Sequence, residues 1–317
     1  MYPEAVTQST TKPNEPAKQL EKLFGSLLDE VQILRQRPHL IELSGGLTNR
    51  NLLINNSFGK SVARISSNSS SLLAIDRESE YQNSKLAAEV GISPEVLDYL
   101  PGRGLLVIKY IDGQTCSAND VESNLARIAQ SCRTLHSAKP FTRDFNMFEI
   151  QRGYLKIVQE RGFRLPPKYL SYAEKMSQIF AALKILDEGK VPCNNDLLPG
   201  NFIDDGQKIW IIDFEYSGNN DACFELGNIW AEAFLELDRL EELVNSYYGQ
   251  KRPEKFARAW LLALAAKYGW TLWASIQSSV SDLDFDFWTW GMQKYELVES
   301  EFSSSLFERM LEQATQK

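Results

Sequence analysis

The segment CNNDLLPGNF, residues 193–202, gathers short polar residues between apolar neighbours. Asp196 lies five positions before Asn201, and Asp213 lies twelve positions after Asn201, at the end of the apolar run WII. The DDGQ sequence between them is typical of a turn, so we expect a β-hairpin that brings Asn201 and Asp213 to the same end of adjacent strands. Two oxygen ligands with a second carboxylate on the preceding loop suit Mg²⁺. The alternative is that these residues are only turn formers.

Phosphoryl transfer uses this combination of groups. Mg²⁺ neutralises phosphate oxygens, and a carboxylate orients the attacking hydroxyl and accepts its proton. Other chemistries fit the sequence less well, because His39 and His136 are the only histidines. A Ser-His-Asp triad and a His-rich zinc site are therefore implausible. We interpret His136, which has apolar neighbours, as a structural residue.

The elements that position these groups fall into two parts. Residues 20–110 read as a sheet-rich region with strands in IELSGGLTNRNLLINN, KSVARISS and SPEVLDYLPGRGLLVIKYIDG, and with one helix, AIDRESEYQNSKLAAEVG, that ends at Gly91. From VESNLARIAQSCRTLHS onward the pattern is mainly helical, apart from the loop and hairpin at 191–216. The first part is expected to be a small lobe and the second a larger helical lobe.

The loop and hairpin carry a resemblance to a known family. The pattern D-x-x-x-x-N followed by IIDFEY is similar to the catalytic loop and metal-binding Asp of the protein-kinase-like superfamily. The D-F-E variant resembles the choline/ethanolamine kinase and aminoglycoside phosphotransferase branch. SGGLTNRN looks like the nucleotide loop of that branch, and FEYSGNNDACFELGNIWAE and GWTLWASIQ are similar to choline kinase segments. The resemblance covers about residues 40–300.

The resemblance implies a fold and its boundaries. It implies a bilobal α+β kinase-like fold, with a small five-stranded antiparallel sheet and one helix, a linker near 110–116, and a larger, mainly helical lobe. We expect a flexible tail at 1–16, an N-lobe at 17–112 and a C-lobe at 113–317.

The resemblance also implies roles for individual residues. Asp196 would be the catalytic base, and Asn201 and Asp213 would bind Mg²⁺. Arg64 would replace the superfamily's strand lysine, with Glu80 as its helix partner, although the two could instead form a plain surface pair. The residues implied to bind ATP are Ser44, Gly45, Gly46, Thr48, Asn49, Arg64, Glu80, Lys109, Tyr110 and Ile111.

Two features depart from the family pattern or stand outside it. Asn194 replaces the histidine that usually lies two positions before the catalytic Asp, and an Asn side chain can still donate a hydrogen bond to the metal-Asp turn. The serine run at 66–71 is expected to be a flexible loop, with a lid over the nucleotide as the alternative.

Aromatic residues in the C-terminal third suggest what the acceptor is. Trp270 and Trp273 lie three residues apart on an expected helix and share a face. Aromatic cages bind quaternary ammonium groups by cation-π attraction. The resemblance implies a pocket with Glu232 as counter-charge and aromatic walls, and the residues assigned to it are Tyr216, Glu232, Trp270, Trp273, Phe287 and Trp290. Aromatic residues at helical spacing are also common in cores, which is the alternative.

We therefore expect an ATP-dependent kinase that phosphorylates an amino alcohol, most plausibly choline. A second reading keeps the kinase and changes the acceptor to ethanolamine, thiamine or an aminoglycoside. The aminoglycoside stays open because of four carboxylates, Glu232, Asp282, Asp284 and Asp286. A third reading is a non-catalytic relative that binds a nucleotide or an amine, which the change at Asn194 would permit.

Composition places limits on partners and location. The 317 residues carry a formal charge of −8 without a prominent basic run, which argues against nucleic-acid binding. The four cysteines are scattered, and the sequence has neither a signal-like N-terminus nor an 18-residue apolar run. We expect a cytoplasmic protein that does not insert into membranes, with ATP and a small amino alcohol as partners; a homodimer is left open.

Overall fold

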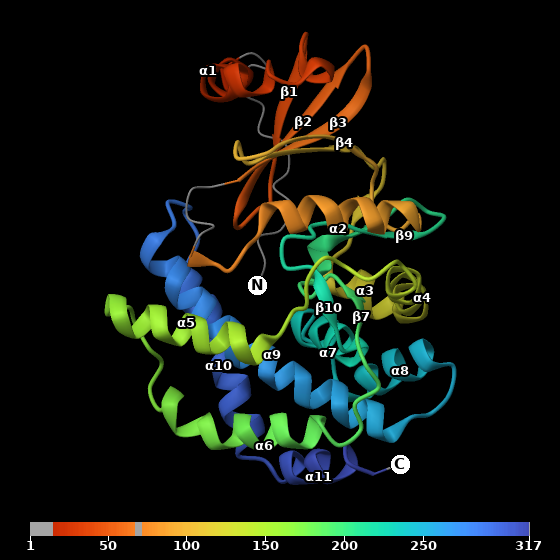
Figure 1. Cartoon of the computed structure of the whole chain (residues 1–317), viewed down its shortest axis with the longest axis vertical. Helices are drawn as coiled ribbons and strands as arrows, with labels where there is room; N and C mark the ends of the chain where they lie inside the picture. The colour runs from red at the N-terminus through yellow and green to blue at the C-terminus, as the bar shows by residue number, and fades with distance from the viewer. Residues whose placement is uncertain (1–14, 67–71, 317) are drawn as a thin grey trace.

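The computed structural model describes residues 15–66 and 72–316. A small sheet with one helix on its outer side lies above a larger group of helices (Figure 1). Most of the expected tail, and the serine run apart from Ser66, lie outside the described residues. The α+β, kinase-like arrangement expected from the sequence is confirmed.

The small lobe is built on a five-stranded antiparallel sheet in the order β1-β2-β3-β5-β4. Its strands are β1 (His39–Leu43), β2 (Asn49–Asn56), β3 (Gly59–Ser66), β4 (Val96–Leu100) and β5 (Leu105–Lys109). Leu52 and Ile54, two positions apart in β2, are fully buried because alternate side chains point to one face of a sheet. Their core also contains Leu20 and Leu28 of helix α1 (Glu15–Leu28). A short 3₁₀ turn, η1 (Gln32–Leu34), follows α1.

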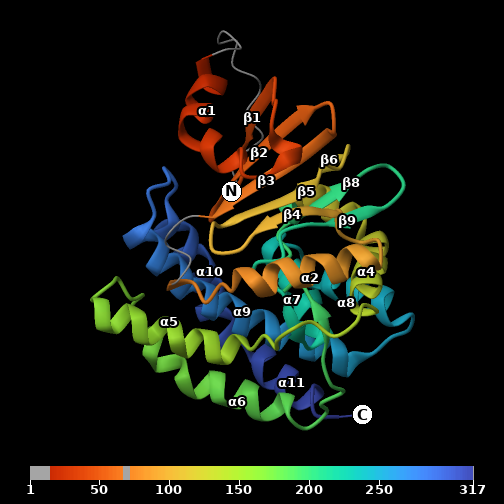
Figure 2. The same ribbon diagram turned by 45° about the horizontal axis from the view of Figure 1, so that its top comes forward.

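Helix α2 (Arg77–Glu89) joins the sheet to the helical lobe (Figures 1 and 2). It begins where the Asp76 side chain accepts a hydrogen bond from the Ser79 N–H, and Gly91 follows its end with φ +74°, as the sequence predicts. The Asn83 side chain donates to Ser217 Oγ at 3.0 Å and accepts from the Thr142 N–H at 3.1 Å. Helix α2 is therefore held against the helical lobe as well as lying beside the sheet.

The large lobe surrounds helix α9 (Pro253–Val280), which is buried along most of its length and packs against α5, α7 and α10. A helix that is apolar on nearly every side needs neighbours on every side, and the surrounding helices supply them. The other helices are α3 (Ala118–Ser123), α4 (Leu125–His136), α5 (Met147–Arg161), η3 (Tyr169–Tyr172), α6 (Ala173–Leu183), α7 (Ala222–Glu232), α8 (Leu237–Tyr248), α10 (Phe287–Phe302) and α11 (Ser305–Gln313).

Two small antiparallel sheets hold the segment that carries the expected chemistry. One pairs β7 (Val191–Cys193) with β10 (Gly218–Asn220), and the other contains β6 (Gln114–Thr115), β8 (Phe202–Asp204) and β9 (Ile209–Ile211). The turn η4 (Pro199–Asn201) precedes β8. Strands β8 and β9 form the expected hairpin, with Phe202 opposite Ile211.

Within residues 15–66 and 72–316, none of the helices has the length and apolar character needed to cross a bilayer.

Candidate active site

The β8–β9 hairpin brings Asn201 and Asp213 together. The Ile212 N–H donates to the Asn201 carbonyl at 3.0 Å, so the residues on either side of this bond lie at one end of the hairpin. The Asn201 side-chain N–H donates to the Asp196 carbonyl at 2.7 Å, which leaves the side-chain oxygen of Asn201 as its candidate metal ligand. Asp213 takes a left-handed conformation with φ +62°, which turns the chain sharply after β9. A carboxylate and an amide oxygen here fit the ligand preference of Mg²⁺.

One cavity of about 60 Å³ collects groups from both lobes. From the small lobe it is lined by the loop at 45–48, which is expected to bind the nucleotide and is here called the nucleotide loop. From the large lobe it is lined by the expected catalytic and metal-binding residues and by aromatic side chains. The complete lining is Gly45, Gly46, Leu47, Thr48, Asp196, Leu198, Asn201, Asp213, Glu215, Tyr216, Glu232, Trp270, Trp273 and Trp290. Residues separated by more than 240 positions in the sequence thus surround one small space.

Asp196 has the environment of a proton acceptor. Burial raises the pKa of its carboxyl well above the ordinary value, and the nearby carboxylates of Glu232 and Asp213 raise it further. The Lys294 ammonium lowers this pKa but does not reverse the shift. A carboxylate with a raised pKa is a stronger base once it is ionised, which suits general base catalysis.

Asn194 fills the place of the family histidine. Its side-chain N–H group donates to the Ile212 carbonyl at 3.2 Å and to the Asp213 carbonyl at 2.8 Å. Its side-chain oxygen accepts from the Asp196 N–H at 3.1 Å. One amide therefore ties Asp196 to the turn that carries Asp213, the expected metal ligand, and the expected hydrogen bond from Asn194 is present.

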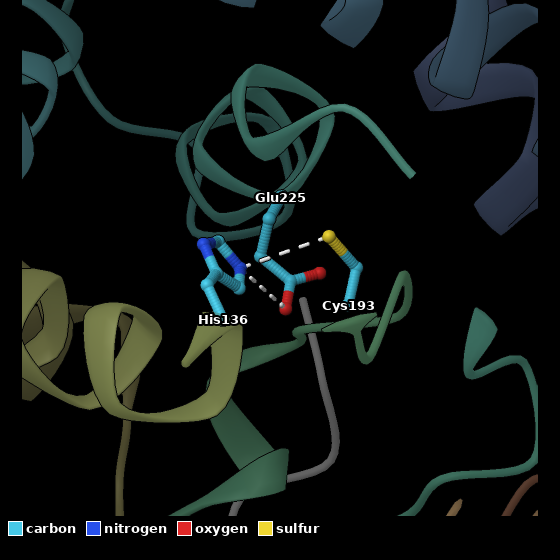
Figure 3. Close-up of side chains that lie close together, drawn as sticks. All are labelled: His136, Cys193 and Glu225. Carbon is cyan, nitrogen blue, oxygen red and sulfur yellow. Dashed lines mark hydrogen bonds and ion pairs between the residues drawn. The ribbon is translucent and has the colours of Figure 1, made fainter. Parts of the chain in front are cut away.

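The backbone of the same loop is held by Glu225 of α7 (Figure 3), which the sequence analysis did not identify. The Glu225 carboxylate accepts from the Asn194 N–H at 2.9 Å and from the Asn195 N–H at 2.8 Å. His136 Nε2 lies 3.7 Å from the same carboxylate and 3.7 Å from Cys193 Sγ. The signal that could have found Glu225 is a carboxylate in the middle of the apolar run ACFELGNIW.

The His136, Cys193 and Glu225 cluster is better explained as an anchor than as a metal site. Its three candidate ligand atoms lie within 4.8 Å of one another. Both Glu225 oxygens already accept backbone N–H groups. Burial, with the nearby Glu225 carboxylate, raises the pKa of the Cys193 thiol well above its ordinary value, so the sulfur keeps its proton in this arrangement. His136 donates to or accepts from Tyr247 through Nδ1 at 2.7 Å, in keeping with a structural role.

Arg64 and Glu80 form a buried ion pair, and the alternative of a plain surface pair is wrong. Arg64 lies 3.2 Å from Glu80 and 2.6 Å from Asp213, and the side chains of Arg64 and Glu80 are 8% and 4% exposed. Burial opposes the charge of Arg64, but the three facing carboxylates of Asp213, Glu80 and Glu215 outweigh it and raise the pKa of the guanidinium. Arg64 thus connects the small-lobe sheet and α2 to the metal-binding turn.

Glu215, the third residue of the D-F-E sequence, holds the nucleotide loop down, a contact that the sequence analysis missed. Its carboxylate accepts from the Thr48 hydroxyl at 2.7 Å and from the Asn49 side chain at 2.8 Å. Arg77 donates to it at 3.2 Å. Burial and the neighbouring Asp213 raise the pKa of Glu215 to about 7, while Arg64 and Arg77 lower it.

The other expected nucleotide-binding residues divide between two places. Gly45, Gly46 and Thr48 line the cavity, and a Cβ on Gly46 would lie 2.2 Å from the Asn49 carbonyl oxygen, so only glycine fits there. Ser44 is exposed at the start of the loop. Lys109, Tyr110 and Ile111 line a separate cavity of about 640 Å³ with residues such as Trp210. Hinge residues contact adenine chiefly through backbone groups, so this placement leaves their role a prediction.

Aromatic side chains form the acceptor end of the cavity. The Tyr216 and Trp270 rings lie 5.0 Å apart, and those of Trp273 and Trp290 lie 5.6 Å apart, both edge to face. The Trp273 indole N–H donates to the Tyr216 hydroxyl at 2.9 Å. The placement of Phe287 corrects the expected set of pocket walls. Phe287 is 2% exposed and packs 5.7 Å from Trp273, behind that ring, and it is not among the described residues that line the cavity.

Glu232 lines the acceptor end, and a lysine that the sequence analysis missed is bound to it. The Lys294 ammonium donates to both Glu232 oxygens, at 2.6 Å and 2.5 Å, and each side chain is 2% exposed. The ammonium also lies 4.2 Å from the Trp290 ring centre. The signal for Lys294 was its position four residues after Trp290, which places both on one face of α10.

Comparison with known proteins gives the family. The family model described as choline/ethanolamine kinase matches residues 40–255. Protein LicA of Haemophilus influenzae is 28% identical over 212 residues, which are 65% of this chain and 62% of LicA. Ethanolamine kinase 2 of Rattus norvegicus is 26% identical over 244 residues, which are 68% of this chain and 63% of that protein. The chain thus spans less than two thirds of the length of these two relatives.

A solved structure is similar over almost the whole chain. The choline/ethanolamine kinase family protein from Mesorhizobium loti superposes with a TM-score of 0.82 at 28% identity, covering 93% of this chain and 99% of that one. Residues 40–255, which the family model matches, contain Asp196, the β8–β9 hairpin and α7. The chain belongs to the choline/ethanolamine kinase family.

Proposed function

We propose that the protein transfers the γ-phosphoryl group of ATP to the hydroxyl of choline, giving phosphocholine and ADP. One observation carries this proposal. Asp196, Asn201 and Asp213 line the same small cavity as three tryptophans, so a base, a metal-binding pair and an ammonium-binding surface face one space. Family membership supports a phosphotransferase with an amino alcohol as acceptor.

The residues of the site fit this reaction. Asn201 and Asp213 would hold Mg²⁺, which neutralises negative charge on the phosphates when it is bound. Asp196 would accept the proton of the choline hydroxyl as the hydroxyl oxygen forms its bond to the γ-phosphorus and the bond to the ADP oxygen breaks. Arg64 would keep Asp213 oriented and add positive charge near the phosphates. Glu215 would keep the nucleotide loop closed over the cavity.

The aromatic end supports choline among amino alcohols. The faces of Trp270, Trp273 and Trp290 attract an ammonium without requiring hydrogen bonds from it. Indole N–H groups are donors only, so they cannot accept hydrogen bonds from a primary ammonium. A trimethylated ammonium loses less on leaving water for such a surface.

Ethanolamine is a second candidate, favoured by the presence of a carboxylate, Glu232, at the acceptor end. The aminoglycoside reading has less support. The carboxylate of Asp286 caps α10 by accepting from the Thr289 N–H at 3.0 Å, and neither Asp282, Asp284 nor Asp286 is among the described residues that line the cavity. The hydrogen bonds from Asn194 keep the catalytic loop ordered and so weigh against the non-catalytic reading. We further infer a cytoplasmic protein, in keeping with four free cysteines.

ADP release with Mg-ATP across choline, ethanolamine, thiamine and an aminoglycoside tests the proposal. The expected result is turnover with choline at the highest kcat/KM and loss of turnover in Asp196→Asn. Asp238→Asn, at an exposed position on α8, is the matched control and should keep wild-type turnover. Higher kcat/KM with another acceptor would overturn the choline assignment, and ATP binding without turnover in any arm would overturn the kinase assignment.

A further inference from the structure

A buried lysine lies behind the carboxylate of the acceptor cavity. Glu232 lines the cavity, whereas Lys294 is not among the described lining residues and is 1% exposed. Its ammonium donates to both carboxylate oxygens of Glu232. Lys294 therefore does not block the cavity, but it offsets the charge that Glu232 presents there and uses one acceptor position on each oxygen.

The aromatic residues that surround Glu232 in the cavity offer few hydrogen-bond acceptors. The indole N–H groups of Trp270 and Trp290 are donors, and neither has an acceptor within the described part of the chain. The Tyr216 hydroxyl already accepts from Trp273. Among the carboxylates that line the cavity, Glu232 is the one bound to a lysine ammonium, and its strength as an acceptor depends on how much of its charge Lys294 offsets.

We propose that Lys294 is a specificity-determining residue, which directs this site to a quaternary ammonium alcohol and away from a primary amine. By holding both oxygens of Glu232, Lys294 weakens the acceptor that three N–H donors of a primary ammonium would need. A quaternary ammonium needs no acceptor and keeps its attraction to the indole faces. The inference rests on the proposed phosphotransferase function and adds the residue that selects between its two leading acceptors.

Removing the lysine charge should therefore raise kcat/KM for the two acceptors by unequal factors. A carboxylate without the lysine attracts any cation more strongly. Only a primary ammonium can also donate hydrogen bonds to the two positions that Lys294 releases, and hydrogen bonds between charged groups are the stronger class. The preference for choline over ethanolamine should shrink even where both acceptors bind better.

The test compares kcat/KM for ethanolamine and for choline in wild type and in Lys294→Met. The ratio of the two values is expected to rise about tenfold in favour of ethanolamine, chiefly through a lower KM for ethanolamine. In the double variant Glu232→Gln/Lys294→Met the carboxylate is gone as well, so the ratio should return to the wild-type value or fall below it. Lys294→Gln keeps an N–H donor without the charge and should give an intermediate ratio.

The control is Lys255→Met, which removes another buried lysine that pairs with one carboxylate, Glu188, away from the cavity. The Lys255 and Lys294 side chains are 3% and 2% exposed, so the two variants are matched for burial. Lys255→Met should leave the ethanolamine-to-choline ratio unchanged, even if it lowers thermal stability. A merely structural role for Lys294 would lower activity with both acceptors alike.

The outcomes separate this inference from the proposed function. Turnover in wild type with an unchanged ratio in Lys294→Met and Lys294→Gln would overturn the role of Lys294 and leave the kinase standing. Absence of turnover in wild type would overturn the kinase, and the ratio of choline and ethanolamine dissociation constants, read from tryptophan fluorescence, would still decide the role of Lys294. If Lys294→Met fails to fold, Lys294→Gln and the double variant carry the test.

Discussion

Helix α7 carries two buried carboxylates whose hydrogen-bond donors differ in charge. Glu225 and Glu232 lie seven residues apart, which is close to two helical turns, so they occupy one face of the helix. Glu225 is surrounded by uncharged donors, the N–H groups of Asn194 and Asn195. Glu232 is bound to a charged donor, the ammonium of Lys294. One face of one helix thus anchors the loop that carries Asp196 and lines part of the cavity.

The two carboxylates differ in what their partners determine: the partners of Glu225 concern the position of a loop, and the partner of Glu232 concerns the charge in the cavity. The anchor at Glu225 is made to the backbone N–H groups of Asn194 and Asn195, which every residue type except proline provides, so this contact does not depend on the side chains at those two positions. The charge of Glu232 is set by its partner Lys294, so a single change at Lys294 alters the field in the cavity without moving the wall. Under the proposed function, catalysis and specificity would therefore depend on different neighbours of the same helix.

Loss of the anchor should have the largest effect. Glu225→Ala leaves two buried N–H groups, of Asn194 and Asn195, without their acceptor, and we expect a loss of about 4 kcal/mol in the free energy of unfolding. Displacement of Asp196 should also lower kcat by about a hundredfold. Urea unfolding and steady-state turnover measure both effects, with Glu241→Ala on the exposed side of α8 as control. A stability loss below about 1 kcal/mol would show that the loop is held by other contacts.

Removal of one member of the Glu232–Lys294 pair should lower the free energy of unfolding slightly less than Glu225→Ala does. Removal of the second member should restore most of that loss. Glu232→Gln leaves the buried Lys294 ammonium without its carboxylate, and we expect a loss of about 3 kcal/mol in unfolding free energy. The double variant with Lys294→Met has neither charge of this pair and should lie within about 1 kcal/mol of wild type. Thermal or urea unfolding of both single variants and the double variant gives the coupling energy. Additive losses would contradict a coupled pair, and no second change is expected to repair Glu225→Ala in this way.

Loss of the Asn194 side chain should lower the free energy of unfolding by an intermediate amount. Asn194→Ala removes the hydrogen bonds to the Ile212 and Asp213 carbonyls and should cost about 2 kcal/mol in unfolding free energy. Because these bonds orient the metal-binding turn, we expect a higher Mg²⁺ requirement in the ADP-release assay. Asn194→His, which restores the residue typical of the wider superfamily, is the comparison variant and should retain more activity. Equal activity of Asn194→Ala and wild type would remove the clamp from the mechanism.

Substitution of an exposed carboxylate should have the smallest effect on the free energy of unfolding. Glu42 pairs with Arg50 on neighbouring strands, and the two side chains are 38% and 44% exposed. Water already solvates both charges, so Glu42→Gln should change the unfolding free energy by less than about 0.5 kcal/mol. Chemical unfolding at low and high salt measures this. A loss comparable with that of Glu232→Gln would mean that burial is not what makes the Glu232–Lys294 pair costly to break.

The sequence predicted the features whose signals are local. The end of α2 at Gly91 and the β8–β9 hairpin follow from turn and capping chemistry within a few residues. Asn201 and Asp213 could be paired because only one hairpin separates them. The resemblance then extended this to the lobes and to most of the acceptor wall.

Partners that meet through tertiary packing were not predictable in the same way. Thr48 and Glu215 are separated by 167 positions, and Glu232 and Lys294 by 62. No local pattern specifies which buried carboxylate meets which donor. Phe287 shows the same limit, since the resemblance implied it as a wall of the pocket but could not show that it packs against Trp273 and is not among the described residues that line the cavity.

The contacts of the nucleotide loop have a consequence for turnover. Gly45 to Thr48 form one side of the acceptor cavity, the Thr48 hydroxyl is bonded to Glu215, and the Leu47 carbonyl accepts from Gln277 at 3.3 Å. An acceptor enclosed in this way leaves only after these interlobe bonds break. The rate of catalysis would then be limited by the opening of the loop, and solvent viscosity, rather than the strength of the base, would control the maximal rate.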